Sequence, residues 1–309
     1  MNAMTLHQAD LPPLRSPSGV RCARTLLILL GAVVIAAGGW AADTSTAQAR
    51  FVRFQRGATT AYGIMEGERV RELSGDLFGA WTRTDRLHSL DTVKLLAPTQ
   101  PTQVLAMAGN YRSHLNSAEI PPKFRIPQPF LKSPSCLIGD GAAIVLPKDA
   151  RDVHFEGELV LGIGKTTRQA SMEKAAEAIF GVTCGNDVSE RYWQNDEENK
   201  DIQWWRAKGS DTFGPVGPWI VTGLDWNNLE LRVRVNGDVK QQDRTSRLIH
   251  DAAAIVSMIS RYVTLHPGDL VFTGTPGTTS ALKPGDVVEV EIEGIGVLRN
   301  SVERQSGRM

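Results

Sequence analysis

Two acidic residues stand two positions apart in an otherwise apolar stretch of the chain, His154–Gly164. Residues i and i+2 of a β-strand point to the same face, so Glu156 and Glu158 are expected side by side, with Gly157 leaving room on the other face. Two buried, unpaired carboxylates repel each other and lose their hydration, which is costly. A hard divalent cation bound between them would remove that cost. The competing interpretation is an exposed sheet edge with two solvated acids.

A third carboxylate, Asp187, lies at the end of a second buried-looking strand, residues 181–188. With Glu156 and Glu158 it would complete a three-oxygen face on one metal ion and leave the other positions to water or substrate. Ligation by carboxylates alone favours Mg²⁺, Mn²⁺ or Ca²⁺ over zinc. On spacing alone, a simple strand-end cap explains Asp187 equally well.

Short motifs around these acids follow one another in a fixed order between residues 100 and 300. They are Gly109–His114, Phe130–Pro134, Phe155–Leu159, Gly185–Val188 followed by Arg191 and Gln194, Lys208–Pro218, and Thr273–Pro276. No single motif is specific, but their combination resembles the fumarylacetoacetate hydrolase family.

The resemblance implies a mixed β-sandwich roll, usually dimeric, that binds Mg²⁺ or Mn²⁺ through the carboxylates matching Glu156, Glu158 and Asp187. Members of the family act on small 1,3-dicarbonyl or 2-oxo acids by acylpyruvate hydrolysis, oxaloacetate decarboxylation, or isomerisation or decarboxylation of ring-cleavage products. This chemistry suits the residues, because two neighbouring substrate oxygens can chelate one metal ion. The metal then stabilises the enolate that leaves when a C–C bond breaks.

Other motif residues are expected to surround the substrate. Lys208 would add positive charge next to the enolate, the alternative being a solvated lysine. Arg191 and Gln194, one turn apart on a helix, look like the pair that orients the substrate in the family.

Three more residues have expected roles in substrate binding. Thr275 would hold a substrate carboxylate with its hydroxyl and backbone N–H. Lys132 either neutralises the same anion or is a structural surface lysine. Tyr111 either orients a lid over the substrate or caps the preceding strand.

The expected catalytic base, His114, departs from the family pattern. Hydrolytic members pair this histidine with a glutamate three residues later, which orients it to activate water. Here Ser117 stands at that position, and Glu119 follows two residues further on. Either Glu119 orients His114 through a non-helical turn, or the protein favours decarboxylation or tautomerisation, which need no activated water.

Three functions follow from these residues. The first is a metal-dependent hydrolase or lyase that cleaves a C–C bond in an acylpyruvate-like oxo acid. The second is an isomerase or oxaloacetate-type decarboxylase on the same scaffold. The third is an exported protein that binds metal and oxo acid without catalysis.

The elements that must position these residues are mainly strands. Strands are expected at residues 104–108, 154–164, 181–188, 229–235, 270–272 and 287–292, with a hairpin turn at Asn236-Gly237. Ser171 is expected to cap a helix over residues 172–179, and residues 252–263 have the apolar spacing of a second helix. Strands outnumber helices and do not alternate regularly with them, which predicts an α+β, mainly β fold. A small β-rich region at residues 50–99 precedes the catalytic domain at 100–309.

Residues 1–49 have the pattern of a secretory signal peptide, with arginines, then an apolar run, then an A-x-A site at Ala47–Ala49. Cleavage there predicts an exported or periplasmic protein. The alternatives are a membrane anchor at residues 25–42, or a cytoplasmic protein with a misassigned start codon.

The composition of the 309-residue chain narrows the choice of partners. Its 34 basic and 34 acidic residues give no support for a nucleic-acid partner or a polybasic membrane surface. Cys136 and Cys184 are expected to be small buried residues, or a disulfide if the protein is exported.

Overall fold

The computed structural model describes residues 48–115, 117 and 119–307. The predicted signal peptide or anchor at residues 1–49 lies outside these residues, except for its last two positions. Within the described ranges, no helix is both long and apolar enough to cross a bilayer. Mixed β-sheets with a few short helices make up the fold, which confirms the predicted α+β, mainly β class.

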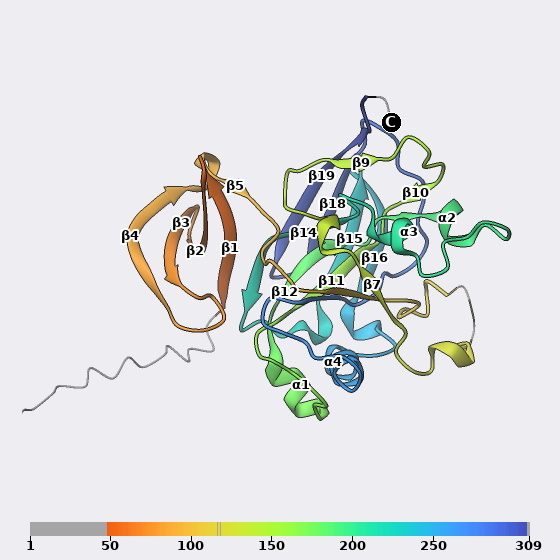
Figure 1. Ribbon diagram of the computed structural model, residues 1–309, viewed down its shortest axis with the longest axis horizontal. Helices are drawn as coiled ribbons and strands as arrows, with labels where there is room; N and C mark the ends of the chain where they lie inside the picture. Colours follow the sequence, from red (N-terminus) through yellow and green to blue (C-terminus); the bar gives the residue numbers. More distant parts are fainter. Residues whose placement is uncertain (1–47, 116, 118, 308–309) are drawn as a thin grey trace, which may run out of the picture. The chain divides into compact units, whose positions relative to one another are not determined.

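Most strands belong to one large sheet (Figure 1). In spatial order it contains β4 (Trp81–Ser89), β3 (Arg69–Gly75), β2 (Thr59–Glu66), β1 (Ala49–Arg56), β14 (Gly214–Thr222), β12 (Ile179–Asn186), β11 (Gly157–Ile163), β17 (Leu270–Phe272), β6 (Val104–Met107) and β7 (Pro129–Lys132), while β5 (Lys94–Leu95) pairs with β1 and β8 (Leu137–Ile138) with β14. Strands β1 to β5 lie in the small β-rich region, and β1 pairs antiparallel with β14.

A second sheet has five strands. Its order is β16 (Asp238–Arg244), β15 (Glu230–Val235), β18 (Val287–Ile292), β19 (Gly296–Arg304) and β9 (Ile144–Leu146). Asn236 and Gly237 connect β15 to β16 with φ angles of 54° and 87°, the positive values that a tight hairpin turn requires. The sequence pattern missed β19, because the polar Asn300 occupies one of its buried positions and donates to the carbonyl oxygens of Gly139 and Ala142.

The main core lies between the two sheets. Leu159 and Leu161 of β11 and Val182 of β12 join one cluster with Val233 of β15 and Val290 of β18. Every residue of β11 is buried. Polar side chains at the start of β11 are therefore held inside the protein, where they need partners.

The described residues also contain four short α-helices. They are α1 (Met172–Ala178), α2 (Arg191–Asn195), α3 (Trp205–Gly209) and α4 (Ala252–Ser260), and α1 and α4 lie side by side (Figure 1). As predicted, Ser171 caps α1 by accepting the N–H of Lys174. A short ladder of β10 (Val153–His154) and β13 (Ser189–Glu190) leads into α2. Cys136 and Cys184 are both buried and free, so the alternative of a disulfide is wrong.

Candidate metal and substrate site

The stretch His154–Gly164, which contains Glu156 and Glu158, does not form one continuous strand. β10 ends at His154 and β11 begins at Gly157, so Glu156 lies in the connection between them. There the N–H of Glu156 donates to Oδ1 of Asn186 at 2.9 Å, and the N–H of Asp187 donates to the carbonyl of Glu156 at 2.8 Å. The prediction that both glutamates share a strand face is wrong for Glu156, because a side-chain amide takes the place of the β-ladder at this residue.

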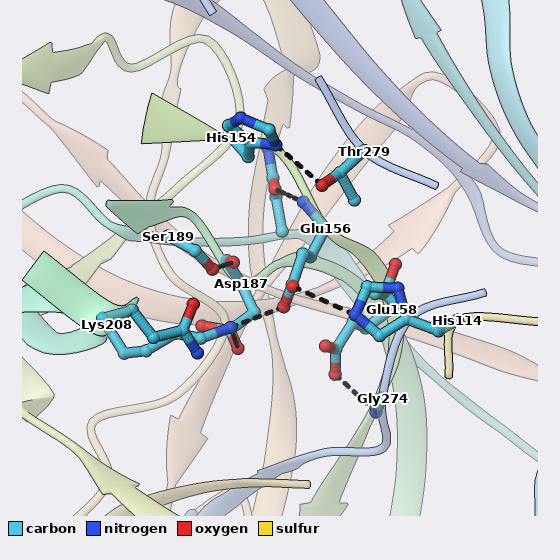
Figure 2. Close-up of polar contacts among 12 residues, drawn as sticks. His114, His154, Glu156, Glu158, Asp187, Ser189, Lys208, Gly274 and Thr279 are labelled. Atoms are coloured by element: carbon cyan, nitrogen blue, oxygen red, sulfur yellow. Dashed lines mark hydrogen bonds and ion pairs between the residues drawn. The ribbon is translucent and has the colours of Figure 1, made fainter. Parts of the chain in front are cut away.

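Antiparallel pairing nevertheless brings the three acids together (Figure 2). Glu158 lies opposite Gly185 in the β11–β12 ladder, and Asp187 directly follows β12. One oxygen atom from each of Glu156, Glu158 and Asp187 lies within 4.8 Å of the others. The three residues are 4%, 1% and 1% exposed. This burial excludes the alternative of a solvated sheet edge.

Gly157 allows β11 to lie close to the second sheet. A Cβ atom at this position would lie 2.1 Å from Cγ2 of Val233 on β15. The N–H of Gly157 donates to Oε1 of Gln241 at 3.1 Å. The absent side chain thus lets a strand of the second sheet pack directly behind the acids.

Two acids of the cluster carry cationic partners. Lys208 donates from Nζ to Oε2 of Glu156 at 2.5 Å and to Oδ2 of Asp187 at 2.7 Å. Arg191 donates from Nη2 to Oε1 of Glu156 at 2.5 Å. Burial alone would raise the pKa of Glu156, but the charges of Lys208, Arg191 and His114 lower it well below its usual value. Glu156 is therefore ionised, as a metal ligand must be.

Glu158 lacks such compensation. Its Oε2 accepts the N–H of Gly274 at 2.6 Å, whereas Oε1 is buried without a hydrogen-bond partner among the described residues. Burial, together with the charges of Asp187 and Glu156, raises the pKa of Glu158 well above its usual value. A divalent cation fits these residues, because it would satisfy the orphaned oxygen and remove the repulsion among the three acids.

A pocket of about 270 Å³ opens beside the acids. Its polar lining residues are His114, Glu156, Arg191, Gln194, Lys208 and Thr275, and its large apolar lining residues are Met107, Leu115, Phe124, Phe130 and Trp204. Ligand pockets usually measure roughly 300–1,000 Å³. The pocket is therefore suited to a small molecule that contacts both polar and apolar side chains.

His114 faces this pocket, but a different group from the one expected orients it. Its Nδ1 lies 2.7 Å from the carbonyl oxygen of Gly277, and its Nε2 lies 3.7 Å from Oε1 of Glu156. Glu119 is exposed, and its backbone carbonyl accepts the hydroxyl of Ser117 at 2.6 Å. The structure does not bring the Glu119 carboxylate to His114, because Glu119 is exposed to solvent.

Lys132 neither neutralises a substrate anion nor lies at the surface, the two roles that the sequence suggested. Its side chain is fully buried, and Nζ donates to Oδ1 of Asp187 at 2.6 Å and to the carbonyl oxygens of Lys208 and Phe213. Burial alone would lower the pKa of Lys132, but the Asp187 carboxylate and other nearby anions raise it. All three ammonium protons have protein acceptors, so Lys132 supports Asp187 and does not bind substrate.

Tyr111 and Thr275 also differ from expectation. Tyr111 is 1% exposed, its backbone bridges to Leu248, and it does not line the pocket. Its predicted role in substrate binding is wrong, because its ring packs into the interior. Thr275 does line the pocket, but its hydroxyl donates to the carbonyl of Gly157 at 2.9 Å and accepts from Nε2 of Gln241 at 3.0 Å.

Arg191 and Gln194 lie as expected on one turn of α2, where Nη1 of Arg191 donates to Oε1 of Gln194 at 2.7 Å. Three contributors to the site were missed: Gln241 on β16, the carbonyl of Gly277, and the hydroxyl of Thr279. Gln241 gave no signal because it lies in an exposed-looking strand. A backbone carbonyl carries no signal in the residue type. Thr279 stands three residues after the Thr273–Pro276 motif, which was the only available hint.

Two protein-family models together match nearly all of the described residues. The family described as fumarylacetoacetate (FAA) hydrolase C-terminal matches residues 103–303, and that described as Rv2993c-like, N-terminal matches residues 49–98. The chain is 48% identical to Protein Rv2993c of Mycobacterium tuberculosis over 258 residues, 79% of this chain and 94% of that protein. It is 37% identical to the mitochondrial oxaloacetate tautomerase fahd2 of Xenopus laevis over 226 residues, 69% of this chain and 70% of that protein.

Solved structures resemble the chain as well. One is 2-hydroxyhepta-2,4-diene-1,7-dioate isomerase from Mycobacterium marinum, with 42% identity and a TM-score of 0.75, covering 84% of this chain and 100% of that one. Another is maleylpyruvate hydrolase from Sphingobium sp. SYK-6 in complex with manganese(II) and pyruvate. It shares 28% identity and a TM-score of 0.68, covering 83% of this chain and 100% of that one.

Proposed function

The chain belongs to the fumarylacetoacetate hydrolase family of enzymes, and we propose that it is a divalent-metal-dependent isomerase that moves a proton between carbon and oxygen in a small 2-oxo acid. The observation that carries this proposal is the contact between Nδ1 of His114 and the carbonyl oxygen of Gly277. All residues given a role lie within the proposed catalytic domain at residues 100–309.

The contact with Gly277 determines which ring nitrogen of His114, the proposed base, carries a proton. A carbonyl oxygen only accepts hydrogen bonds, so Nδ1 of His114 carries a proton. In the neutral imidazole, Nε2 then has a free lone pair; His114 lines the pocket, and its Nε2 lies 3.7 Å from Oε1 of Glu156, another lining residue. His114 can take a proton from the carbon next to the substrate's keto group and deliver it to the oxygen atom, or carry out the reverse transfer. The proton count balances without any other reactant.

Proton transfer within the substrate needs an oriented base but no activated water. A carboxylate on Nδ1 would orient the ring and also stabilise the imidazolium that forms whenever His114 takes a proton. The carbonyl of Gly277 supplies the orientation but no negative charge. Ser117 and the exposed Glu119 do not replace the missing carboxylate.

We assign Glu156, Glu158 and Asp187 as the ligands of one Mg²⁺ or Mn²⁺ ion. When bound, such an ion polarises the substrate carbonyl and lowers the cost of negative charge on its oxygen. Lys208 lies within hydrogen-bond distance of two of these ligands and adds positive charge on the same side of the pocket. The manganese in the similar maleylpyruvate hydrolase supports the choice of ion.

Arg191 and Gln194 are proposed to bind the carboxylate of the oxo acid. Three N–H groups of Arg191 donate to Glu156, Gln194 and Thr279. Of its five N–H donors, two remain for substrate among the contacts of the described residues. The names of the similar oxaloacetate tautomerase and heptadienedioate isomerase support an oxo-acid or enol-acid substrate.

A second candidate function is hydrolysis of a C–C bond in an acylpyruvate. It is favoured by the position of Glu156, whose Oε1 lies 3.7 Å from Nε2 of His114 and can stabilise an imidazolium after water loses a proton. The similar maleylpyruvate hydrolase supports this option.

A substrate panel separates the two functions. Purified full-length protein with Mg²⁺ is assayed for loss of the ultraviolet absorbance of enol-oxaloacetate, for pyruvate release from oxaloacetate, and for hydrolysis of acetylpyruvate. Mg²⁺ without protein and the Glu158→Gln variant are the controls, because free metal also promotes enolisation. Faster enol–keto conversion without acetylpyruvate cleavage supports the isomerase. Acetylpyruvate cleavage without enol–keto conversion contradicts it and supports the hydrolase.

A further inference from the structure

A continuous chain of side-chain contacts leads from the rim of the site to Arg191. Asp152 Oδ1 lies 2.9 Å from Nε2 of His154, and Nδ1 of His154 lies 2.8 Å from Oγ1 of Thr279. Oγ1 of Thr279 in turn lies 3.1 Å from Nη2 of Arg191. Figure 2 shows His154 and Thr279 reaching toward each other on the side of Glu156 away from Gly274.

Two hydrogen bonds in this chain have a direction fixed by the groups themselves. The carboxylate of Asp152 accepts, so Nε2 of His154 donates to it. Arg191 has no acceptor atom, so its Nη2 donates to Oγ1 of Thr279. His154 contacts the same Oγ1 through Nδ1 and so holds the Thr279 side chain beside the guanidinium.

This orientation matters because Nη2 of Arg191 has two hydrogens with two different acceptors. One donates to Oε1 of Glu156 and the other to Oγ1 of Thr279. A guanidinium is planar, so holding both hydrogens of Nη2 defines the plane of the whole group. Gln194 holds Nη1 from the other side. The donors that remain for substrate, the Nε–H and one N–H of Nη1, then have fixed directions in that plane.

Without Thr279, Glu156 would hold Nη2 by one contact only, and Gln194 alone would oppose rotation of the guanidinium about it. The side chain of Arg191 is 15% exposed, so little solvent is present to compensate.

We propose that Thr279, oriented by His154 and Asp152, is a positioning residue that sets the plane of Arg191 for binding the carboxylate of a 2-oxo acid. The inference rests on the proposed function, since it assigns the carboxylate to Arg191. Thr279 does not touch the substrate and acts only through Arg191.

The test uses full-length protein, Mn²⁺, and pyruvate as the probe, with both binding steps measured by titration calorimetry. Thr279→Val removes the hydroxyl at nearly constant shape, and Thr279→Ser retains it. Thr278→Val is the matched control, because Thr278 is the exposed neighbour in the same loop. Loss of a hydrogen bond to a charged group predicts about tenfold weaker pyruvate binding in Thr279→Val. Mn²⁺ binding without pyruvate and the melting temperature should stay as in the wild type, and Thr279→Ser should restore pyruvate binding.

A double variant shows whether the effect passes through Arg191. In an Arg191→Gln background, Thr279→Val should no longer change pyruvate binding, because the group it positions is absent. Equal pyruvate binding by wild type and Thr279→Val overturns the inference. An undiminished effect in the Arg191→Gln background, or equal weakening of Mn²⁺ and pyruvate, also overturns it. Failure of the wild type to bind pyruvate in the presence of Mn²⁺ would instead remove the proposed function, and the inference with it.

Discussion

Lys132 donates from Nζ to Oδ1 of Asp187 at 2.6 Å, with both side chains at most 1% exposed. Lys208 binds the other oxygen of the same carboxylate at 2.7 Å. The two lysines therefore have different tasks. Lys132 holds Asp187 from within the protein, whereas Lys208 lines the pocket.

This difference predicts that Lys132→Met destabilises the protein. Removing one partner of a buried ion pair leaves an uncompensated charge and costs about 3–5 kcal/mol of unfolding free energy. Urea denaturation measures the change. The control is Lys174→Met, which breaks an exposed pair with Glu177 and should cost less than about 1 kcal/mol. An unchanged stability of Lys132→Met with weaker pyruvate binding would favour the role in substrate binding that the sequence suggested.

Glu158 has no cationic partner within the described part of the chain, so the effect of Glu158→Gln on protein stability should depend on whether metal is bound. In chelator, Glu158→Gln should be at least as stable as the wild type, because it removes one of three mutually repelling acids. With Mn²⁺ at 100 times its Kd, the wild type should gain about 2.7 kcal/mol and the variant almost nothing. Thermal unfolding with and without Mn²⁺ measures both effects. Equal stabilisation of the two proteins by Mn²⁺ would show that Glu158 is not a ligand.

The position of His114 in the pocket predicts that it, and not Glu119, carries the proton. His114→Gln should lower kcat by about 10²–10⁴-fold, the usual contribution of a general base. Glu119→Gln is the matched control and should leave kcat nearly unchanged, since its carboxylate faces solvent. Steady-state kinetics on the best substrate of the panel measure both variants. A large loss of kcat in Glu119→Gln would mean that Glu119 reaches His114 during turnover.

The close approach of Gly157 to Val233 predicts that Gly157→Ala is poorly tolerated. The added methyl group overpacks the space between the sheets and should cost about 1–3 kcal/mol of stability. Val233→Ala removes the clashing methyl groups, so the double variant should be more stable than the sum of the two single effects. Chemical denaturation of the four proteins measures this coupling. Strict additivity would show that the clash is relieved by other movements.

Local sequence patterns determined many elements of this protein. Ser171 predicted the start of α1, and Asn236-Gly237 predicted the β15–β16 turn, because capping and turn geometry depend on nearby residues. The sequence also singled out Glu156 and Glu158, because carboxylates in an apolar stretch are costly to bury without a partner. For Asp187 the spacing left a strand-end cap equally open, and only the combination of motifs pointed to a ligand.

The tertiary structure alone decided how the remaining groups meet. Lys132 is buried behind Asp187, and Gly277 replaces a carboxylate on His114. Thr279 holds Arg191 across 88 positions of the chain. These partners lie far apart in sequence, and one of them is a backbone carbonyl that any residue type could supply. Their roles depend on which side chains the packed sheets turn inward, and short-range patterns do not contain that information.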